Sequence, residues 1–295
     1  GGAPATSPRL AASGARRYCA WLAGSPGLGQ QRVTVASSAD GGAVWTAAVA
    51  VDDNGANQRD LALGCEGAVA WLAFFDDPQG LPSPSPGVHL CRTTTGGTMW
   101  TSATRRSAAT SAVADVRTCH DGARVYLVWT RNGALEYVVS VDGGATWPTV
   151  ATEIRSTDLG FITAPAVACE GERLFAAYVG GGDDLAFSRI GAAGASPEHV
   201  TLSAAVEPTG RPSLAARGNY VFVAWRAGDV GSGAGRVRLS TSVDLGLTFT
   251  APAGFGDGTA LQDEPVLVAD SARLWLGFRD SRGPTPALFY NRSEQ

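Results

Sequence analysis

Two short stretches of this sequence each combine arginine with aspartate. One reads WRAGD, from Trp225 to Asp229, and the other reads FRDSRG, from Phe278 to Gly283. A guanidinium group offers paired N–H donors that match a carboxylate, and an aspartate exchanges a proton with a bound ligand. We therefore expect a site for a polar ligand among these candidates: Arg226, Asp229, Arg279, Asp280 and Arg282. The competing interpretation is a set of solvated loop charges, since charged residues are mostly exposed.

Residue types that build metal sites and hydrolase triads do not occur in the required spacing. His89, His120 and His199 share no metal-like spacing, the five cysteines contain no CxxC pair, and no GxSxG turn occurs. The stretch VDDNGANQRD, from Val51 to Asp60, is rich in oxygen ligands but lacks the alternating register of a calcium loop. We expect no metal and no other cofactor, with Ca²⁺ at this stretch as the alternative.

The composition is that of a globular protein that does not bind nucleic acid. The 295 residues are 44% hydrophobic and 17% charged, and the net charge is -4. A nucleic-acid binder carries a basic surface, which this balance does not provide. No apolar run approaches the roughly 20 residues that span a bilayer, so no membrane span is expected. Five cysteines without metal spacing favour a disulfide-permissive compartment, which predicts a secreted, periplasmic or cell-surface protein.

An internal repeat predicts the elements that position the candidates. The octapeptide SVDGGATW, from Ser140 to Trp147, recurs as SADGGAVW from Ser38 and as SVDLGLTF from Ser242, and TTTGGTMW from Thr93 is a worn copy. We call these four segments the box turns. Their shared pattern is Ser/Thr, any residue, Asp, any, Gly, any, Thr, aromatic. It comprises these residues: Ser38, Asp40, Gly42, Trp45, Trp100, Ser140, Asp142, Gly144, Thr146, Trp147, Ser242, Asp244, Gly246, Thr248 and Phe249.

A second motif, a short apolar run that ends in an aromatic residue, recurs in step with the first. The runs end at Trp21, Trp71, Trp129, Tyr178, Trp225 and Phe278, about fifty residues apart. Repeats of short β-branched and aromatic segments without helical periodicity indicate four antiparallel strands per unit, and such units arranged radially form a β-propeller. The sequence therefore predicts an all-β fold, a single six-bladed propeller domain of four-stranded antiparallel blades over residues 1–295. The expected blades are 7–52, 53–107, 108–154, 155–204, 205–256 and 257–295, the last closed by residues 1–6.

Each box turn is expected to join the third and fourth strands of its blade. The aspartate accepts hydrogen bonds from backbone N–H groups across the turn, and the glycine supplies a positive φ. The aromatic residue begins the fourth strand and buries its ring against neighbouring strands. These roles are structural, so the box turns are not expected to carry chemistry.

The box turns resemble a known repeat. Ser140–Trp147 matches the Asp-box (BNR) repeat of the sialidase superfamily at every defined position, and Ser38–Trp45 and Ser242–Phe249 match with one substitution each. This resemblance covers the whole chain and implies a sialidase-like six-bladed propeller. Asp-boxes also occur in sortilin-like receptors, assembly factors and assorted hydrolases, and in sialidases they lie away from the active site. The resemblance therefore implies the fold more firmly than the activity.

The resemblance also implies a catalytic set, which the sequence matches poorly. A sialidase uses three arginines for the substrate carboxylate, the first in an Arg-Ile-Pro motif, and a tyrosine nucleophile with a glutamate and an aspartate acid. The nearest match, Gly210-Arg211-Pro212, is one residue short, and on a strand such a shift turns Arg211 to the other face. An alternative alignment places Arg59 at the motif position. Arg131 lies in a loop comparable to those of Arg226 and Arg279, and FRDSRG resembles the region of the catalytic aspartate.

Three functions remain open from the sequence. The first is a sialidase-like module that binds a glycan or protein partner through the loops opposite the box turns, without the full catalytic set. The second is an exo-sialidase or related glycoside hydrolase with diverged motifs. The third is an assembly or scaffold factor. The six tyrosines all read as strand residues, which favours the binding module over the hydrolase.

Alignment of the repeats also assigns positions to the cysteines. Cys65, Cys119 and Cys169 fall at equivalent turns between first and second strands, and Cys91 lies at the same end of its blade as Cys65. The alignment predicts a Cys65–Cys91 disulfide within a blade and a Cys119–Cys169 disulfide between blades. Cys19 is expected to be a buried free thiol.

Overall fold

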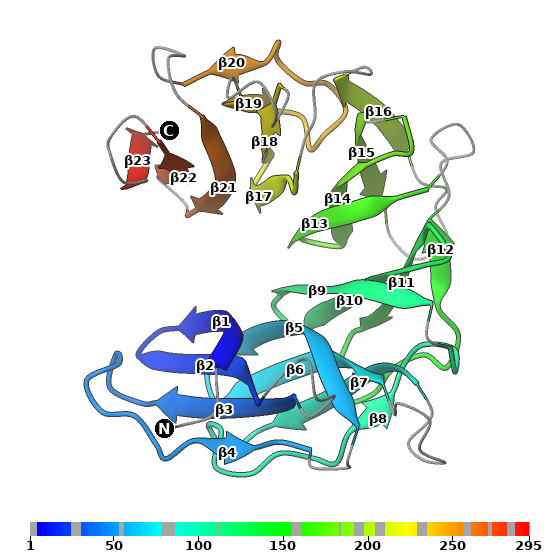
Figure 1. Ribbon diagram of the computed structural model, residues 1–295, viewed down its shortest axis with the longest axis vertical. Coiled ribbons are helices and arrows are strands. Elements are labelled where there is room, and N and C mark those ends of the chain that lie inside the picture. The colour runs from blue at the N-terminus through cyan, green and yellow to red at the C-terminus, as the bar shows by residue number, and fades with distance from the viewer. Residues whose placement is uncertain are drawn as a thin grey trace. The chain divides into compact units, whose positions relative to one another are not determined.

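The computed structural model describes residues 5–24, 31–52, 56–77, 86–110, 112–154, 161–182, 184–191, 198–203, 210–228, 235–255, 261–270, 273–281 and 287–294, the last range without its side chains. By their internal contacts the residues form two compact units, Gly1–Glu153 (unit 1) and Ile154–Gln295 (unit 2). Both units are built of β-strands (Figure 1). This part of the chain contains no helix long and apolar enough to cross a membrane.

Unit 1 contains three antiparallel sheets, each of four strands that pair in sequence order. The first comprises β1 (Ala5–Ser13), β2 (Arg16–Ala23), β3 (Arg32–Ser38) and β4 (Val49–Ala50). The second comprises β5 (Asn57–Glu66), β6 (Val69–Asp77), β7 (Gly87–Thr93) and β8 (Thr104–Arg105). The third comprises β9 (Val113–Asp121), β10 (Arg124–Arg131), β11 (Ala134–Ser140) and β12 (Thr152–Ile154), whose last residue begins unit 2.

Unit 2 contains three further sheets of the same kind. The fourth comprises β13 (Thr163–Glu170), β14 (Arg173–Val179), β15 (Leu185–Ile190) and β16 (Glu198–Ser203). The fifth comprises β17 (Ser213–Arg217), β18 (Tyr220–Ala227), β19 (Arg236–Ser242) and β20 (Ala253–Gly254). The sixth has three strands in the described residues: β21 (Gln262–Ala269), β22 (Arg273–Asp280) and β23 (Ala287–Glu294).

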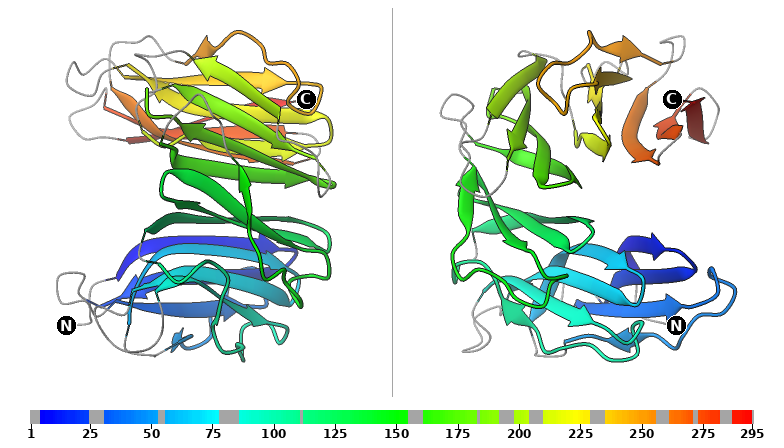
Figure 2. Two further views of the ribbon diagram at one scale, coloured as in Figure 1. Left: turned by 90° about the vertical axis from the view of Figure 1, so that its right-hand side faces the viewer. Right: turned by 180° about the vertical axis from the view of Figure 1, so that it is seen from behind.

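Within each unit the sheets are arranged like consecutive propeller blades. The first strands lie side by side: β1 contacts β5 and β5 contacts β9 in unit 1, and β13 contacts β17 and β17 contacts β21 in unit 2. Each sheet packs face to face on the next one in its own unit (Figure 2). The predicted all-β fold of six antiparallel blades is confirmed.

The predicted apolar runs form the second strand of every blade. Where such a strand is covered on both faces by neighbouring sheets, it is apolar without alternation. In β6, for example, every residue from Ala70 to Asp76 is buried. Trp71, Trp129 and Trp225 are each at most 1% exposed, and burying a side chain of this size contributes roughly 2–3 kcal/mol.

The first strands share a bulge near their beginnings. In five of the six blades a non-glycine residue there has a left-handed backbone, namely Ser7, Asp60, Asp115, Ala164 and Glu264. The pairing with the second strand shifts register at each of these points. Arg59 therefore occupies the position that Thr6 and Asp263 occupy in other blades, as in the alternative alignment of the second repeat. The fifth blade differs, because its positive φ falls on Gly210, directly before Arg211.

Two expectations for strand ends need correction. The box aromatics do not begin the fourth strands, which start later, at Val49, Thr104, Thr152 and Ala253. The aspartate-centred turn occupies the residues up to the aromatic, and the chain then runs several residues before it pairs with the third strand. Ala5 and Thr6 pair with Ala23 and Leu22 in the first blade. Residues 1–4, which were expected to close the last blade, lie outside the described residues.

The predicted disulfides are wrong. All five cysteines are described, and none forms a disulfide. Cys65 lies on β5 opposite Ala70, whereas Cys91 lies on β7 opposite Leu72, so β6 runs between them. Two strand spacings separate their backbones by about 10 Å, too far for a disulfide. Burial raises the pKa of the Cys65 thiol to about 11. Cys119 and Cys169 are likewise not bridged, and Cys19 is half-buried rather than buried.

Candidate ligand-binding site

The box turn at Ser140–Trp147 is held together by its aspartate and serine. Asp142 Oδ1 accepts hydrogen bonds from the backbone N–H of Ala145 at 3.0 Å and of Thr146 at 2.9 Å, and its Oδ2 accepts from the Thr146 hydroxyl at 2.5 Å. Ser140 Oγ donates to Asp142 at 2.7 Å and accepts from the Gly144 N–H at 2.9 Å. These bonds, led by that from the Thr146 hydroxyl, hold the pKa of Asp142 well below its usual range. Both carboxylate oxygens of Asp142 therefore accept hydrogen bonds within the turn.

The other three box turns repeat this pattern, but not all of them form every one of these hydrogen bonds. Asp244 makes the same set of bonds, with the Thr248 hydroxyl at 2.5 Å and the Ser242 hydroxyl at 2.6 Å. Asp40 accepts from the Val44 N–H at 2.9 Å. In the worn copy Thr95 stands where the aspartate would be, and its hydroxyl oxygen accepts the Met99 N–H at 3.0 Å. The turn therefore survives the loss of the carboxylate with fewer bonds.

Box turns also bind each blade to the one before it. Trp71 Nε1 and Arg92 Nε, both from the second blade, donate to the Gly143 carbonyl of the third blade, each at 2.9 Å. A Cβ on Gly144 would lie 1.9 Å from Trp71 Nε1, and its φ is +76°. Only glycine fits this close approach and this backbone conformation.

Within unit 1, the first box turn has no such packing among the described residues. A Cβ on Gly42 would meet only the ring of Trp45 from its own turn. Trp45 is 40% exposed, so the expected burial of this ring is not observed. Trp100, Trp147 and Phe249 are each packed against the apolar cores of their units, as predicted.

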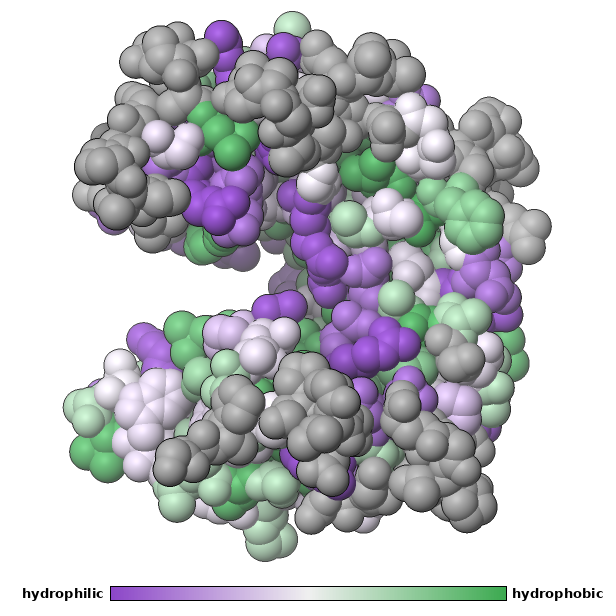
Figure 3. Space-filling model, viewed as in Figure 1, coloured by the Kyte–Doolittle hydropathy of each residue, from purple (hydrophilic) through white to green (hydrophobic). Residues whose placement is uncertain are grey.

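Hydrophilic residues gather over β21 and β22 in unit 2 on the face seen in Figure 3. Arg279, at the end of β22, donates from Nε to Asp263 Oδ1 at 2.7 Å and from Nη2 to Asp263 Oδ2 at 2.5 Å. Its Nη2 also lies 3.7 Å from Glu264 Oε1. The hydrogen bonds that Arg279 donates to Asp263 raise the pKa of Arg279 and lower the pKa of Asp263. The Arg279 side chain is 48% exposed and is engaged in an ion pair with Asp263.

Arg226 is buried beside this ion pair. Its side chain is 7% exposed, and its Nε and Nη2 have no hydrogen-bond partner. Its positive charge lowers the pKa of Asp263, after the larger effect of Arg279. A Cβ on Gly235 would lie 2.3 Å from Arg226 Nε, so the backbone of residue 235 covers that edge of the guanidinium. The backbone at residue 235 leaves no room for a ligand at Arg226 Nε. Arg226 acts on Asp263 through its positive charge.

The remaining predicted candidates are distributed over the chain. Asp280 is fully buried and accepts from Gln262 Nε2 at 3.1 Å, so it faces the protein interior. Arg211 is exposed. Arg59 lies over the ring of Phe75 at 4.0 Å and pairs with Asp60 at 2.7 Å. Asp229 and Arg282 lie outside the described residues. Part of the Val51–Asp60 stretch, the alternative Ca²⁺ site, also lies outside the described residues. Among the residues that are described, no cluster could hold a metal.

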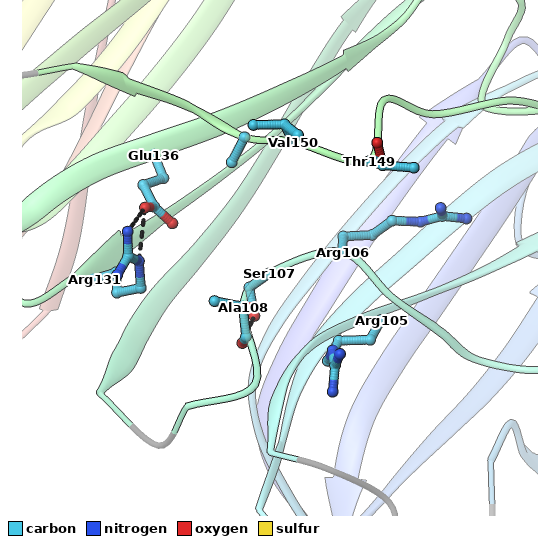
Figure 4. Close-up of a pocket in the computed structure, with 9 residues that line it drawn as sticks. Arg105, Arg106, Ser107, Ala108, Arg131, Glu136, Thr149 and Val150 are labelled. Carbon is cyan, nitrogen blue, oxygen red and sulfur yellow. Dashed lines mark hydrogen bonds and ion pairs between the residues drawn. The ribbon is translucent and has the colours of Figure 1, made fainter.

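A pocket of about 370 Å³ in unit 1 has three arginines in its lining. It lies between the second and third blades, at the end of β8, the hairpin of β10 and β11, and the segment that leads into β12 (Figure 4). The residues that line it are Arg105, Arg106, Ser107, Ala108, Arg131, Glu136, Thr149, Val150 and Ala151. Arg131 was predicted as a candidate, and the structure adds Arg105, Arg106 and Glu136.

Glu136 anchors one wall of this pocket. It is 5% exposed, and its Oε2 accepts from Trp129 Nε1 at 2.7 Å. Its Oε1 accepts from Arg131 Nε at 2.6 Å and also contacts Arg131 Nη2. These bonds raise the pKa of Arg131. Figure 4 shows the two side chains facing each other across the β10–β11 hairpin. Arg131 is thus fixed and largely neutralised.

Arg105 and Arg106 lack a comparable partner. Arg105 is exposed, and Arg106 is half-buried. Among the described residues no carboxylate lies within ion-pair distance of Arg106, and its buried Nε has no hydrogen-bond partner. Burial lowers the pKa of Arg106, and its guanidinium lies 5.8 Å from the Trp147 ring centroid. No sequence pattern indicated this pair of arginines, because β8 is a two-residue strand without a recurring motif.

Four of the six tyrosines are buried within their blades, and Tyr220 is 40% exposed. Tyr18, Tyr126, Tyr137 and Tyr178 are at most 7% exposed, and the side chain of Tyr290 is not described. Tyr178 is hydrogen-bonded to Ser188 at 2.6 Å, and Ser188 to His199 Nδ1 at 2.7 Å. Ser188 is fully buried, so its hydroxyl is not accessible to a substrate, although His199 is exposed.

The fold was compared with known proteins. Neither a protein-family profile nor a curated protein sequence matches the chain. Among solved structures, the Trypanosoma rangeli sialidase matches with a TM-score of 0.59, 12% identity and 98% of this chain covered. The NanB sialidase from Streptococcus pneumoniae matches with a TM-score of 0.61, 8% identity and 94% covered. The chain has the fold of the sialidase superfamily.

The similarity is one of fold, because both identities are low. The sialidase-like propeller spans only 54% of the Trypanosoma rangeli sialidase and 65% of NanB. A further Trypanosoma rangeli structure, of the sialidase with the inhibitor DANA, matches with a TM-score of 0.60 and 13% identity over 98% of this chain and 55% of that one. The resemblance predicted from the box turns is thereby confirmed at the level of the fold.

Proposed function

We propose that this sialidase-like propeller is a binding module for a glycan, which it holds without hydrolysing it. The observation that carries the proposal is the pocket of about 370 Å³ between the second and third blades. Pockets of a few hundred Å³ with a small number of placed polar groups are typical small-molecule sites. This pocket combines guanidinium donors, the Thr149 hydroxyl and small apolar residues, which together suit a ring with hydroxyl and charged groups.

The arrangement of the other charged residues supports binding over hydrolysis. Asp263 is held ionised by Arg279, and Asp280 is buried against Gln262, so neither carboxyl is arranged to donate a proton to a ligand. The structural neighbours include a Trypanosoma rangeli sialidase in complex with 2,3-difluorosialic acid, which makes a glycan the first ligand class to test. We further propose that the module acts in a secreted, periplasmic or cell-surface setting, where glycans are encountered.

The experiment compares two tryptophan substitutions at exposed alanines on a glycan array. Ala108 lines the pocket and Ala47 does not. Ala108→Trp fills the pocket and is expected to abolish glycan capture, whereas Ala47→Trp leaves it unchanged. Equal capture by the two variants would place binding elsewhere. No capture by the wild type would overturn the glycan proposal and favour a scaffold role.

The hydrolase alternative is tested with a fluorogenic sialoside. The proposal predicts no release of the fluorophore above that of a buffer control. Turnover by the wild-type protein would show that the catalytic set is completed by residues that the structure does not describe, and it would replace binding by hydrolysis as the function.

A further inference from the structure

The hairpin between β10 and β11 turns at two residues, Asn132 and Gly133. Arg131 pairs with Ala134 across this loop, and φ is 51° at Asn132 and 78° at Gly133. Two consecutive residues with positive φ in a two-residue loop form a type I′ turn, for which Asn-Gly is a favoured sequence. Asn132 is exposed. The turn therefore presents an asparagine to water, followed by the residue that hinders its neighbour least.

The backbone nitrogen of Gly133 is not held by the fold. The Asn132 N–H donates to the Ala112 carbonyl at 3.2 Å, but among the described residues the Gly133 N–H and the Asn132 carboxamide have no hydrogen-bond partner. Rotation of the peptide between the two residues converts type I′ into type II′ and takes the ψ of Asn132 from about +30° to about −120°. Both turn types fit a hairpin. The rotation brings the Gly133 nitrogen toward the Asn132 side chain and breaks no hydrogen bond at that nitrogen.

The Asp-Gly pairs of the box turns do not have this freedom. The Gly143 N–H donates to the Ala123 carbonyl at 2.8 Å, and the Gly41 N–H is held in the same way at 2.8 Å. Both carboxylate oxygens of Asp142 accept hydrogen bonds within the turn. These bonds keep the pKa of Asp142 low, and an ionised carboxylate is a poor target for a nucleophile. The fold therefore protects these turns and leaves the β10–β11 turn unprotected.

We propose that Asn132 is a modification site, at which deamidation converts the asparagine to aspartate and isoaspartate. The Gly133 nitrogen attacks Asn132 Cγ, and a new C–N bond closes a succinimide ring. The Gly133 N–H proton passes to the side-chain nitrogen, the Cγ–Nδ2 bond breaks, and ammonia leaves. Water then opens the ring. Its addition at Cγ gives aspartate, and its addition at the main-chain carbonyl carbon gives isoaspartate.

The modification acts on a hairpin whose geometry matters. Isoaspartate adds the side-chain methylene to the main chain, so the loop no longer has the length that sets the register of a two-residue hairpin. Arg131 stands directly before the site, and its Nε donates to Glu136 on β11 at 2.6 Å. Protein that carries isoaspartate at position 132 is therefore expected to melt at a lower temperature than fresh protein. This site does not depend on the proposed function.

The test incubates the folded protein at neutral pH and follows each asparagine by peptide mapping with mass spectrometry. Asn219 is the internal control, because it is an exposed asparagine in the hairpin loop between Arg217 and Tyr220, but a tyrosine follows it. Asn132 is expected to react at least about tenfold faster than Asn219, which is about 1.4 kcal/mol in activation free energy. Equal rates at the two positions would overturn the proposal. Asn54, which also precedes a glycine, lies outside the described residues and is followed as a separate position.

A second comparison separates the effect of the fold from that of the Asn-Gly sequence. The folded protein and the chain unfolded in urea are incubated in parallel. The rate at Asn132 is expected to agree within about tenfold between the two samples, whereas Asp142 is expected to isomerise only in urea. Stronger protection of Asn132 by folding, or isomerisation of Asp142 in the folded protein as fast as reaction of Asn132, would contradict the inference.

Two variants link the reaction to the turn. Asn132→Gly removes the carboxamide and keeps a residue that accepts positive φ, so its melting temperature is expected to stay constant during incubation while that of the wild type falls. Asn132→Asp supplies the aspartate product without the extra methylene and is expected to melt close to fresh wild type. An equal fall on incubation in the wild type and Asn132→Gly would place the damage elsewhere and overturn the assigned effect.

Discussion

At the scale of single residues, carboxylates in this chain are mostly used to hold the backbone or another side chain. Asp142 and Asp244 each collect hydroxyl and backbone donors within their own turn. Asp263 and Glu136 each hold one arginine. The box aspartates were predicted from the sequence because their donors are local and recur with the motif. The Glu136–Arg131 pair was not predicted, since Glu136 belongs to no recurring motif and its burial depends on how the β10–β11 hairpin packs.

The box aspartates predict a specific dependence of stability on acid. Hydrogen bonds, first from Ser242 and then from Thr248, lower the pKa of Asp244 from 3.8 to about 2. A carboxyl with a lowered pKa in the folded state stabilises the protein above its unfolded pKa, and this stabilisation is lost as pH falls from about 4 to about 2. Asp244→Asn is therefore expected to make the decline of melting temperature over that pH range shallower.

The worn box turn provides the reciprocal variant. Thr95→Asp restores the missing carboxylate and is expected to raise the melting temperature at pH 7 and to steepen its decline in acid. Melting curves recorded from pH 7 to pH 2 check both variants. Parallel pH profiles for wild type, Asp244→Asn and Thr95→Asp would contradict the assigned role of these aspartates.

The buried Glu136 predicts a loss of stability that an exposed pair does not share. Glu136→Gln removes the counter-charge of Arg131, whose side chain is 31% exposed, so the free energy of unfolding should fall by about 1–2 kcal/mol. Glu198→Gln is the control. It breaks the Arg189 pair, in which Glu198 is 60% exposed, and should cost less than about 0.5 kcal/mol. Urea unfolding of both variants measures the difference, and equal losses would mean that Glu136 is not the buried anchor of the hairpin.

At the scale of elements, box turns form stabilising contacts between consecutive blades. The third-blade turn accepts two donors from the second blade at the Gly143 carbonyl. The sequence predicted the turn and its internal bonds, but not its partners, because Trp71 and Arg92 come from a different repeat. The same limit explains the wrong disulfides. Alignment of repeats placed Cys65 and Cys91 at one end of a blade, yet pairing leaves β6 between them.

This role predicts that two glycines with positive φ respond differently to alanine. Gly144 has φ +76° and would place a Cβ 1.9 Å from Trp71 Nε1, whereas Gly122 has φ +52° and open space around it. Both substitutions strain the backbone by about 1–2 kcal/mol, and Gly144→Ala adds overpacking of about 1–3 kcal/mol. Denaturant melts should show Gly144→Ala to be the more destabilising variant. Equal losses would mean that the turn does not depend on its contact with the second blade.

At the scale of the whole molecule, the sequence predicts the blades better than the site. Six apolar runs and four box turns recur at a nearly constant spacing, and this was enough for the all-β fold and the number of sheets. Ligand sites depend on loops of unequal length and on residues from different repeats, such as Arg105 and Glu136, which no periodicity relates. The predicted candidates Arg226, Arg279 and Asp280 were chosen for their type and position, but in the structure Arg226 and Asp280 are buried and Arg279 is paired with Asp263.

The central claim is that a propeller with the sialidase fold binds a glycan in the pocket between its second and third blades and leaves it intact. A single proton NMR time course of the protein with a sialylated trisaccharide tests this most directly, because one spectrum reports both binding and cleavage. The account predicts broadened signals of the intact trisaccharide with the wild type, sharp signals with Ala108→Trp, and no free sialic acid at any time. Accumulation of free sialic acid, or equal broadening with both proteins, would contradict it.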